Sequence, residues 1–200
     1  MNAPLERQLL DLGDLLTDMY RWVPNAFEGD MRAALREVAV EFCRDTGAFT
    51  DELTLDLVAS QADYDLDPYY AAMVHSIQEA KRGTTLMSPT EYHLVDGDPA
   101  RFRFVTAPSV ASTGGLTVLV QLVPLADCEE FPEAFLSRWR TALVAGAVTR
   151  LTIPGAKNAD VAVHKYFKGD YRAGLADAAA HRLTGGVRGS VSMMSPMSWI

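Results

Sequence analysis

The side chains most able to do chemistry stand apart from one another along this 200-residue chain. The four histidines show neither HxxxH nor HExxH spacing, so a metal site would need ligands from distant segments. We expect each of them to be solvated or satisfied by a local hydrogen bond. GxSxG, Walker and paired CxxC sequences are absent from the chain. The sequence therefore predicts no catalytic residue, no metal site and no cofactor; the histidines are His75, His93, His164 and His181.

The two cysteines can form one disulfide at most, and their spacing supports neither a disulfide framework nor a zinc site. Cys43 follows Phe42 within a helical pattern, which favours a small thiol in the core. Cys128 lies between Asp127 and Glu129, and these acids should raise its pKa rather than activate it. We expect free thiols and an intracellular origin.

Two further segments resemble ligand-binding sites only superficially. Asp63, Asp65 and Asp67 are spaced like a calcium loop, yet Tyr64 and Leu66 alternate with them as in a strand. Residues 185–190, GGVRGS, resemble a phosphate-binding loop. They follow a predicted helix and none comes after them, so no helix N-terminus would face the phosphate. The sequence therefore predicts a strand and a flexible hinge.

The last segment, residues 187–200, carries one charged side chain, and its serines alternate with large apolar residues. Methionine and tryptophan are suited to filling an irregular groove on another protein. The alternatives are a disordered tail and a tail folded back onto its own domain. We predict that the tail binds a partner, through Val191, Met193, Met194, Pro196, Met197, Trp199 and Ile200.

Four amphipathic segments and one alternating segment must position these residues. Apolar residues recur at spacings of three and four over 5–19, 28–46, 135–151 and 158–182, which predicts four helices. Gly47 and Gly185 are placed to end two of them. Within 50–124, apolar and polar residues alternate in short runs separated by turn sequences, which predicts about five to seven antiparallel strands. The stretch 69–81 fits either a strand or a helix.

This order predicts an α+β fold in which an α-helical bundle of about four helices carries an inserted, small antiparallel β module and an extended C-terminal tail. Residues 1–49 with 131–184 would form the bundle, 50–130 the β module, and 185–200 the tail. Helices on both sides of an insertion are expected to pack together, because neither pair buries its apolar stripe alone.

Composition limits the class of protein. The chain is 48% hydrophobic and 22% charged, which excludes a disordered, collagen-like or disulfide-scaffold protein. Its sequence pI near 4.9 argues against a surface that coats nucleic acid. The N-terminal residues lack a secretory signal pattern, and the apolar run at 116–123 is too short to span a bilayer, so we expect no membrane association.

Acidic residues concentrate in the first part of the chain. Residues 1–70 hold 15 acidic and 5 basic side chains, and residues 71–200 hold 11 and 13. Two interpretations stay open: solvated helix faces, or a surface that repels a polyanion or docks a basic partner.

Several segments resemble the head-to-tail adaptor (connector) proteins of short-tailed, podovirus-like phages. Residues 21–26, RWVPNA, and 31–46, MRAALREVAVEFCRDT, are similar to that family's "VP" and "ALRxAAxEFCxxT" patterns. Residues 131–151 resemble its helix that ends in "GAxxRL". A "PxKxW" loop then precedes a helix with aromatic positions. Here residues 154–158 read PGAKN without the tryptophan, and Tyr166–Phe167 follow.

The resemblance spans nearly the whole chain and implies a structural virion protein without enzymatic activity. Such an adaptor would form a homo-oligomeric ring of twelve copies beneath the portal protein, extend the DNA channel and join a tail nozzle or tail tube protein. Double-stranded DNA would pass through without sequence-specific binding, and the C-terminal segment would reach the portal. The expected location is the virion head–tail interface, after assembly in the host cytoplasm.

Two alternatives remain from the sequence. One is a small intracellular enzyme or ligand-binding domain with a pocket between helices and β module, although paired acid–base or metal-ligand spacing is missing. The other is a related tail-completion or neck protein that binds elsewhere in the same virion.

Overall fold

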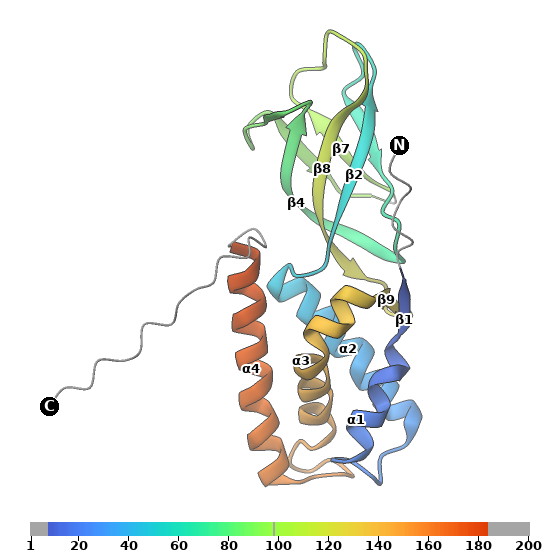
Figure 1. Cartoon of the computed structure of the whole chain (residues 1–200), viewed down its shortest axis with the longest axis vertical. Helices are drawn as coiled ribbons and strands as arrows, with labels where there is room; N and C mark the ends of the chain where they lie inside the picture. The colour runs from blue at the N-terminus through green and yellow to red at the C-terminus, as the bar shows by residue number, and fades with distance from the viewer. Residues whose placement is uncertain (1–7, 98, 184–200) are drawn as a thin grey trace, which may run out of the picture.

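The computed structural model describes residues 8–97 and 99–183 and has a mixed α+β fold. Helices occupy one end of the molecule and antiparallel sheets the other (Figure 1). The helices are α1 (Leu16–Tyr20), α2 (Glu28–Thr46), α3 (Glu133–Leu151) and α4 (Val161–Leu183), with the short 3-10 helix η1 (Leu12–Leu15) before α1. The predicted combination of helices and antiparallel strands is confirmed. The finer description, a bundle with an inserted module and the stated domain boundaries, stays a prediction.

Helix α2 begins and ends where its sequence predicts. Met31, Leu35, Val38 and Phe42 repeat at helical spacing, and each is fully buried. Acidic residues occupy its first turn, where they complement the helix dipole. Gly47 ends the helix with φ +65°, a left-handed conformation that glycine adopts without steric cost.

The first predicted helix is largely wrong. The helix was expected over 5–19; within its described part, Leu9–Asp11 forms strand β1, which pairs antiparallel with β9 (Glu130–Pro132). The Asp11 side chain then accepts a hydrogen bond from the Gly13 amide, which starts η1. Backbone hydrogen bonds to a segment about 120 positions away therefore override the helix that the apolar spacing predicts. Within the described part of that stretch, only Leu16–Tyr20 forms an α-helix.

Helix α3 lies between α2 and α4, and ten of its nineteen residues are buried. A Cβ at Gly146 would lie 2.6 Å from Val38 Cγ1 on α2 and 2.9 Å from the Tyr171 ring on α4. Only glycine therefore permits three helices to approach this closely at one point.

Three antiparallel sheets form the rest of the molecule, and the strand order is β2-β8-β4-β5 in the first, β3-β7-β6 in the second and β1-β9 in the third. Strand β8 (Ser112–Pro124) is paired on both sides and is the most buried strand. The ambiguous segment is strand β4 (Ala72–Arg82), whose pairing shifts twice, at Val74/Ser76 and Ile77/Glu79. The other strands are β2 (Thr50–Leu57), β3 (Asp63–Leu66), β5 (Thr85–Leu86), β6 (Tyr92–Val95) and β7 (Ala100–Phe104).

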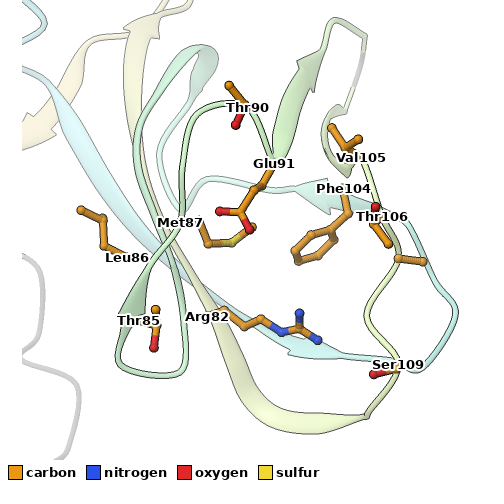
Figure 2. A pocket seen from close by; sticks show the side chains of 11 residues that line it. Arg82, Thr85, Leu86, Met87, Thr90, Glu91, Phe104, Val105, Thr106 and Ser109 are labelled. Atoms are coloured by element: carbon orange, nitrogen blue, oxygen red, sulfur yellow. The ribbon is translucent and has the colours of Figure 1, made fainter.

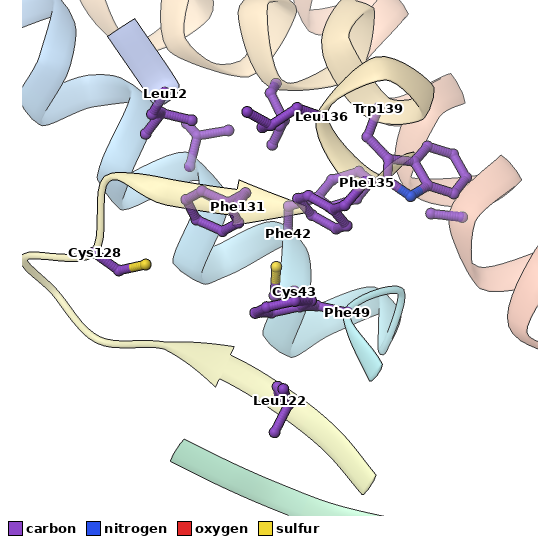
Figure 3. Packing of buried hydrophobic residues seen from close by; sticks show 14 of the residues in the cluster. Leu12, Phe42, Cys43, Phe49, Leu122, Cys128, Phe131, Phe135, Leu136 and Trp139 are labelled. Carbon is purple, nitrogen blue, oxygen red and sulfur yellow. The ribbon is translucent and has the colours of Figure 1, made fainter. Parts of the chain in front are cut away.

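Aromatic side chains fill the junction between helices and sheet (Figure 3). Phe131 stacks on Phe135 with ring centroids 5.5 Å apart, and Phe49 lies 5.8 Å from Phe131 and 5.3 Å from Phe135. Phe42 extends the cluster to Trp139 at 5.5 Å. Buried side chains of the helices and of the sheets thus belong to one continuous core.

A buried glutamine fastens β8 to the end of α2. The Gln121 amide nitrogen donates to the carbonyl oxygens of Cys43 and Arg44, both at 3.1 Å, and its oxygen accepts from the Ser76 hydroxyl at 3.0 Å. These carbonyls lie in the last turn of α2, where a helix leaves its acceptors unpaired. One side chain therefore caps the helix and holds the sheet against it.

Candidate assembly surfaces

The predicted partner-binding tail, Val191, Met193, Met194, Pro196, Met197, Trp199 and Ile200, lies outside the described residues. Its role stays a prediction.

Two of the segments that carry the adaptor resemblance meet along α2 and α3. The guanidinium group of Arg150, in the "GAxxRL" segment, lies 2.9 Å from the Glu37 carboxylate and forms a second ion pair with Glu41. The Tyr171 hydroxyl donates to the same Glu41 at 3.4 Å. Burial raises the pKa of Tyr171, and the charge of Glu41 raises it further, so the hydroxyl remains a donor at neutral pH. Charged residues of one motif thus form ion pairs with charged residues of the other.

A shallow groove of about 660 Å³ runs beside this ion-pair cluster. Its lining is of mixed charge and holds Arg36, Glu37 and Arg44 of α2, together with Ala126 and Asp127 from the segment after β8. The sequence-based alternative requires a pocket between helices and sheet. Between the helices and the sheets the structure has the packed aromatic core of Figure 3, and the groove lies open on the outside of this junction.

The remaining motif segments come together at the other end of the helices. Trp22, from the RWVPNA segment, stacks on Tyr166 with ring centroids 6.4 Å apart and contacts Phe167 edge-on at 5.0 Å. Lys157, from the PGAKN loop, places its ammonium group 4.0 Å from the centre of the Phe27 ring. Three segments that are distant in sequence therefore share one aromatic site.

Much of this site is exposed to solvent. Trp22 is 40% exposed, Tyr166 62% and Phe27 65%, values that are unusual for large aromatic side chains. Exposed apolar clusters of this kind are typical of protein interfaces. This surface could not be predicted from the sequence, because its members come from the segment after α1 and from helix α4, which are distant in sequence. We call it the aromatic end patch, formed by Trp22, Phe27 and Tyr166.

The sheets enclose a second hollow, of about 570 Å³, between the β4–β5 hairpin and the segment after β7 (Figure 2). Met87 and Phe104 form its apolar wall, and the Arg82 guanidinium group extends into it. The Glu91 carboxylate at its rim accepts a hydrogen bond from the Ser88 amide at 2.6 Å. This site combines one cation with an apolar wall.

Some of the other residues that the sequence offered as candidates for chemistry make hydrogen bonds or ion pairs within the fold. His164 Nδ1 lies 3.1 Å from the carbonyl oxygen of Thr149. Asp63 and Asp65 belong to strand β3, as predicted, and Asp63 pairs with Arg103. Among the described residues, no three histidine, cysteine or acidic side chains lie close enough to bind a metal ion together.

Both cysteines are buried free thiols. Burial raises the pKa of Cys43 well above its ordinary value. The pKa of Cys128 is raised as predicted, but burial is the main cause and the neighbouring acids add to it. Its thiol donates to the Glu130 carbonyl oxygen at 3.3 Å, a bond that only the protonated thiol can make.

Within the described part of the chain, no helix has both the length and the apolar character needed to cross a membrane. No protein-family model and no curated protein matches the sequence. Among solved structures, the chain is similar to a chain from the "neck of empty GTA particle computed with C6 symmetry". The TM-score is 0.32 and the identity 11%, over 80% of this chain and 94% of that one. A likeness of this size assigns no family, and the function has to be argued from the surfaces described above.

Proposed function

We propose that this protein is a non-enzymatic structural protein of a virion, a head-to-tail adaptor that forms a ring beneath the portal protein. One observation supports the proposal most. The segments that resemble the adaptor family, separate in sequence, contact each other: Arg150 of the "GAxxRL" pattern pairs with Glu41 of the "EFC" pattern, and Trp22, beside the "VP" pair, stacks on Tyr166. Chance similarity in unrelated segments would not be expected to produce such contacts.

The architecture suits an assembly role. The molecule is elongated, with helices at one end and sheets at the other (Figure 1), so neighbouring copies can pack along its length. It also exposes the aromatic end patch, a surface of the type that proteins bury against partners. A closed ring needs two different faces on each copy that meet head to tail.

In this proposal the C-terminal tail attaches each copy to the portal. Val191, Met193, Met197 and Trp199 supply flexible and aromatic anchors, and the segment carries one charge, Arg188, so desolvating it on a partner costs little. The opposite end of the ring would receive a tail nozzle or tail tube protein.

The acidic N-terminal third would line or approach the DNA channel. Residues 1–70 hold 15 acidic and 5 basic side chains, and a like-charged wall lets double-stranded DNA slide without sequence-specific binding. The ring would hold twelve copies and act at the head–tail interface of the virion, after assembly in the host cytoplasm.

The proposal is tested by mixing the full-length chain with the portal protein of the same virus, followed by native mass spectrometry and electron microscopy. We expect a complex of one portal ring and one ring of this protein, coaxial with the portal channel. A chain that stays free in the presence of assembled portal would contradict the proposal.

A further inference from the structure

Helix α4 presents a positively charged face to solvent. Lys165, Lys168 and Arg172 follow one another at spacings of three and four residues, so they lie on the same side of the helix, and all three are exposed. Gly169 lies between them on the helix, and a Cβ there would meet no atom within 4 Å. We call this surface the basic α4 face.

These cations differ from other arginines of the molecule. Arg32, Arg103, Arg140 and Arg150 each form an ion pair with a carboxylate. Lys165, Lys168 and Arg172 form none with any residue in the described part of the chain. A row of unpaired, exposed cations is a surface suited to an acidic protein partner.

The opposite side of the same molecule has the complementary properties. In Figure 1, α4 lies along one edge of the helices, and η1, α1 and the start of α2 lie along the other. Residues 9–30 hold five acidic side chains and one basic. Asp14 and Asp30 are exposed, and their carboxylates form no ion pair with described residues, while Tyr20 of the same segment is 42% exposed. We call this surface the acidic edge.

We propose that the basic α4 face of one copy docks on the acidic edge of the next copy. The inference rests on the proposed ring and names the contact that builds it. Two different faces on opposite sides of one subunit make a head-to-tail contact, which closes into a ring when the rotation between copies divides a full turn. Tyr20 supplies apolar area on the acidic edge, and the opposite charges set the orientation in which two copies meet.

Charge exchange in the full-length chain tests the contact. Lys168→Glu with Arg172→Glu reverses the basic α4 face, and Asp14→Lys with Asp30→Lys reverses the acidic edge. Each pair alone places like charges together, so we expect the concentration needed for half-assembly on the portal to rise by about tenfold or more near roughly 100 mM salt. The chain with all four substitutions restores opposite charges and should assemble as the wild type does.

Lys81→Glu with Arg101→Glu is the matched control for the Lys168/Arg172 pair, because it makes the same change in net charge on the exposed side of the sheets and should leave assembly unchanged. Thermal unfolding of every variant shows whether the fold is intact. If the wild type forms rings and each two-residue variant assembles equally well, or if the four-residue variant is not rescued, the contact is wrong. If the wild type forms no ring with or without portal, the proposed function itself is wrong.

Discussion

At the scale of single residues, the indole of Trp139 is the largest contribution of α3 to the core. It is 4% exposed, lies 5.5 Å from Phe42 and 6.2 Å from the ring of His181, and Arg138 covers it at 5.1 Å. Replacing it leaves a cavity between α2, α3 and α4, because these helices approach too closely at Gly146 to collapse further.

We therefore expect Trp139→Ala to lower the free energy of unfolding by about 3–5 kcal/mol, measured by urea denaturation. Trp139→Phe keeps part of the ring and should lose clearly less. An unchanged unfolding midpoint for the alanine variant would show that the indole does not contribute to the core.

The thiol of Cys43 offers a test of burial without a change in volume. Burial holds the pKa of this thiol well above its ordinary value of 9.0, so the reactive thiolate is scarce in the folded protein. In the Cys128→Ser variant we expect no labelling by a disulfide reagent at pH 8, and full labelling after denaturation. Rapid labelling of the folded variant would contradict the packing shown in Figure 3.

The same shift makes a prediction about alkaline pH. The folded state keeps the Cys43 proton as pH rises above 9.0, whereas the unfolded chain releases it there. Stability from this group is therefore complete below pH 9 and falls above it. Cys43→Ala should flatten the decline of the unfolding free energy between pH 8 and 10, and a decline of identical slope would contradict the assignment.

At the scale of elements, Gln121 decides how sheet and helices are joined. Gln121→Leu keeps the side-chain volume but leaves the Cys43 and Arg44 carbonyls and the Ser76 hydroxyl without this partner. We expect a loss of about 1–3 kcal/mol in unfolding free energy, measured by denaturant titration.

Gln78→Leu is the comparison variant. Gln78 also donates to the last turn of α2, at the Gly47 carbonyl, but over 3.3 Å in a partly buried position that water can reach. Its loss should be the smaller of the two. Equal losses would show that the Gln121 bonds are not specific to the buried junction.

Elements whose structure depends mainly on neighbouring residues could be predicted from the sequence. Helix α2 could be bounded because its apolar spacing, first-turn acids and Gly47 agree. Strand β3 could be separated from a calcium loop because Tyr64 and Leu66 alternate, and both are buried.

Elements set by distant contacts could not be predicted in this way. Strand β1 exists through its pairing with β9, and strand β4 is irregular because two register shifts break its alternation. The aromatic end patch is of the same kind, since Trp22, Lys157 and Tyr166 become neighbours only after the helices pack. The predicted tail site stays untested by the fold.

At the scale of the whole molecule, the helices and sheets share one core. Their buried residues form one continuous cluster within the described part of the chain, and we expect this cluster to fold without residues 187–200. Deleting these residues should leave the melting temperature unchanged but abolish attachment to the portal, as measured by co-purification.

A milder variant separates the tail's chemistry from its length. Replacing Met193, Met197 and Trp199 with serine keeps the number of residues and removes the apolar anchors, so it should also prevent attachment. Portal binding that survives both changes would show that another surface makes this contact.

Cryo-electron microscopy of the purified virion tests the central claim most directly. The account predicts a ring of this fold below the portal, coaxial with the DNA channel, with the basic α4 face of each copy against the acidic edge of its neighbour. A reconstruction in which this protein is absent from the head–tail junction, or lies there as isolated copies without lateral contact, would contradict it.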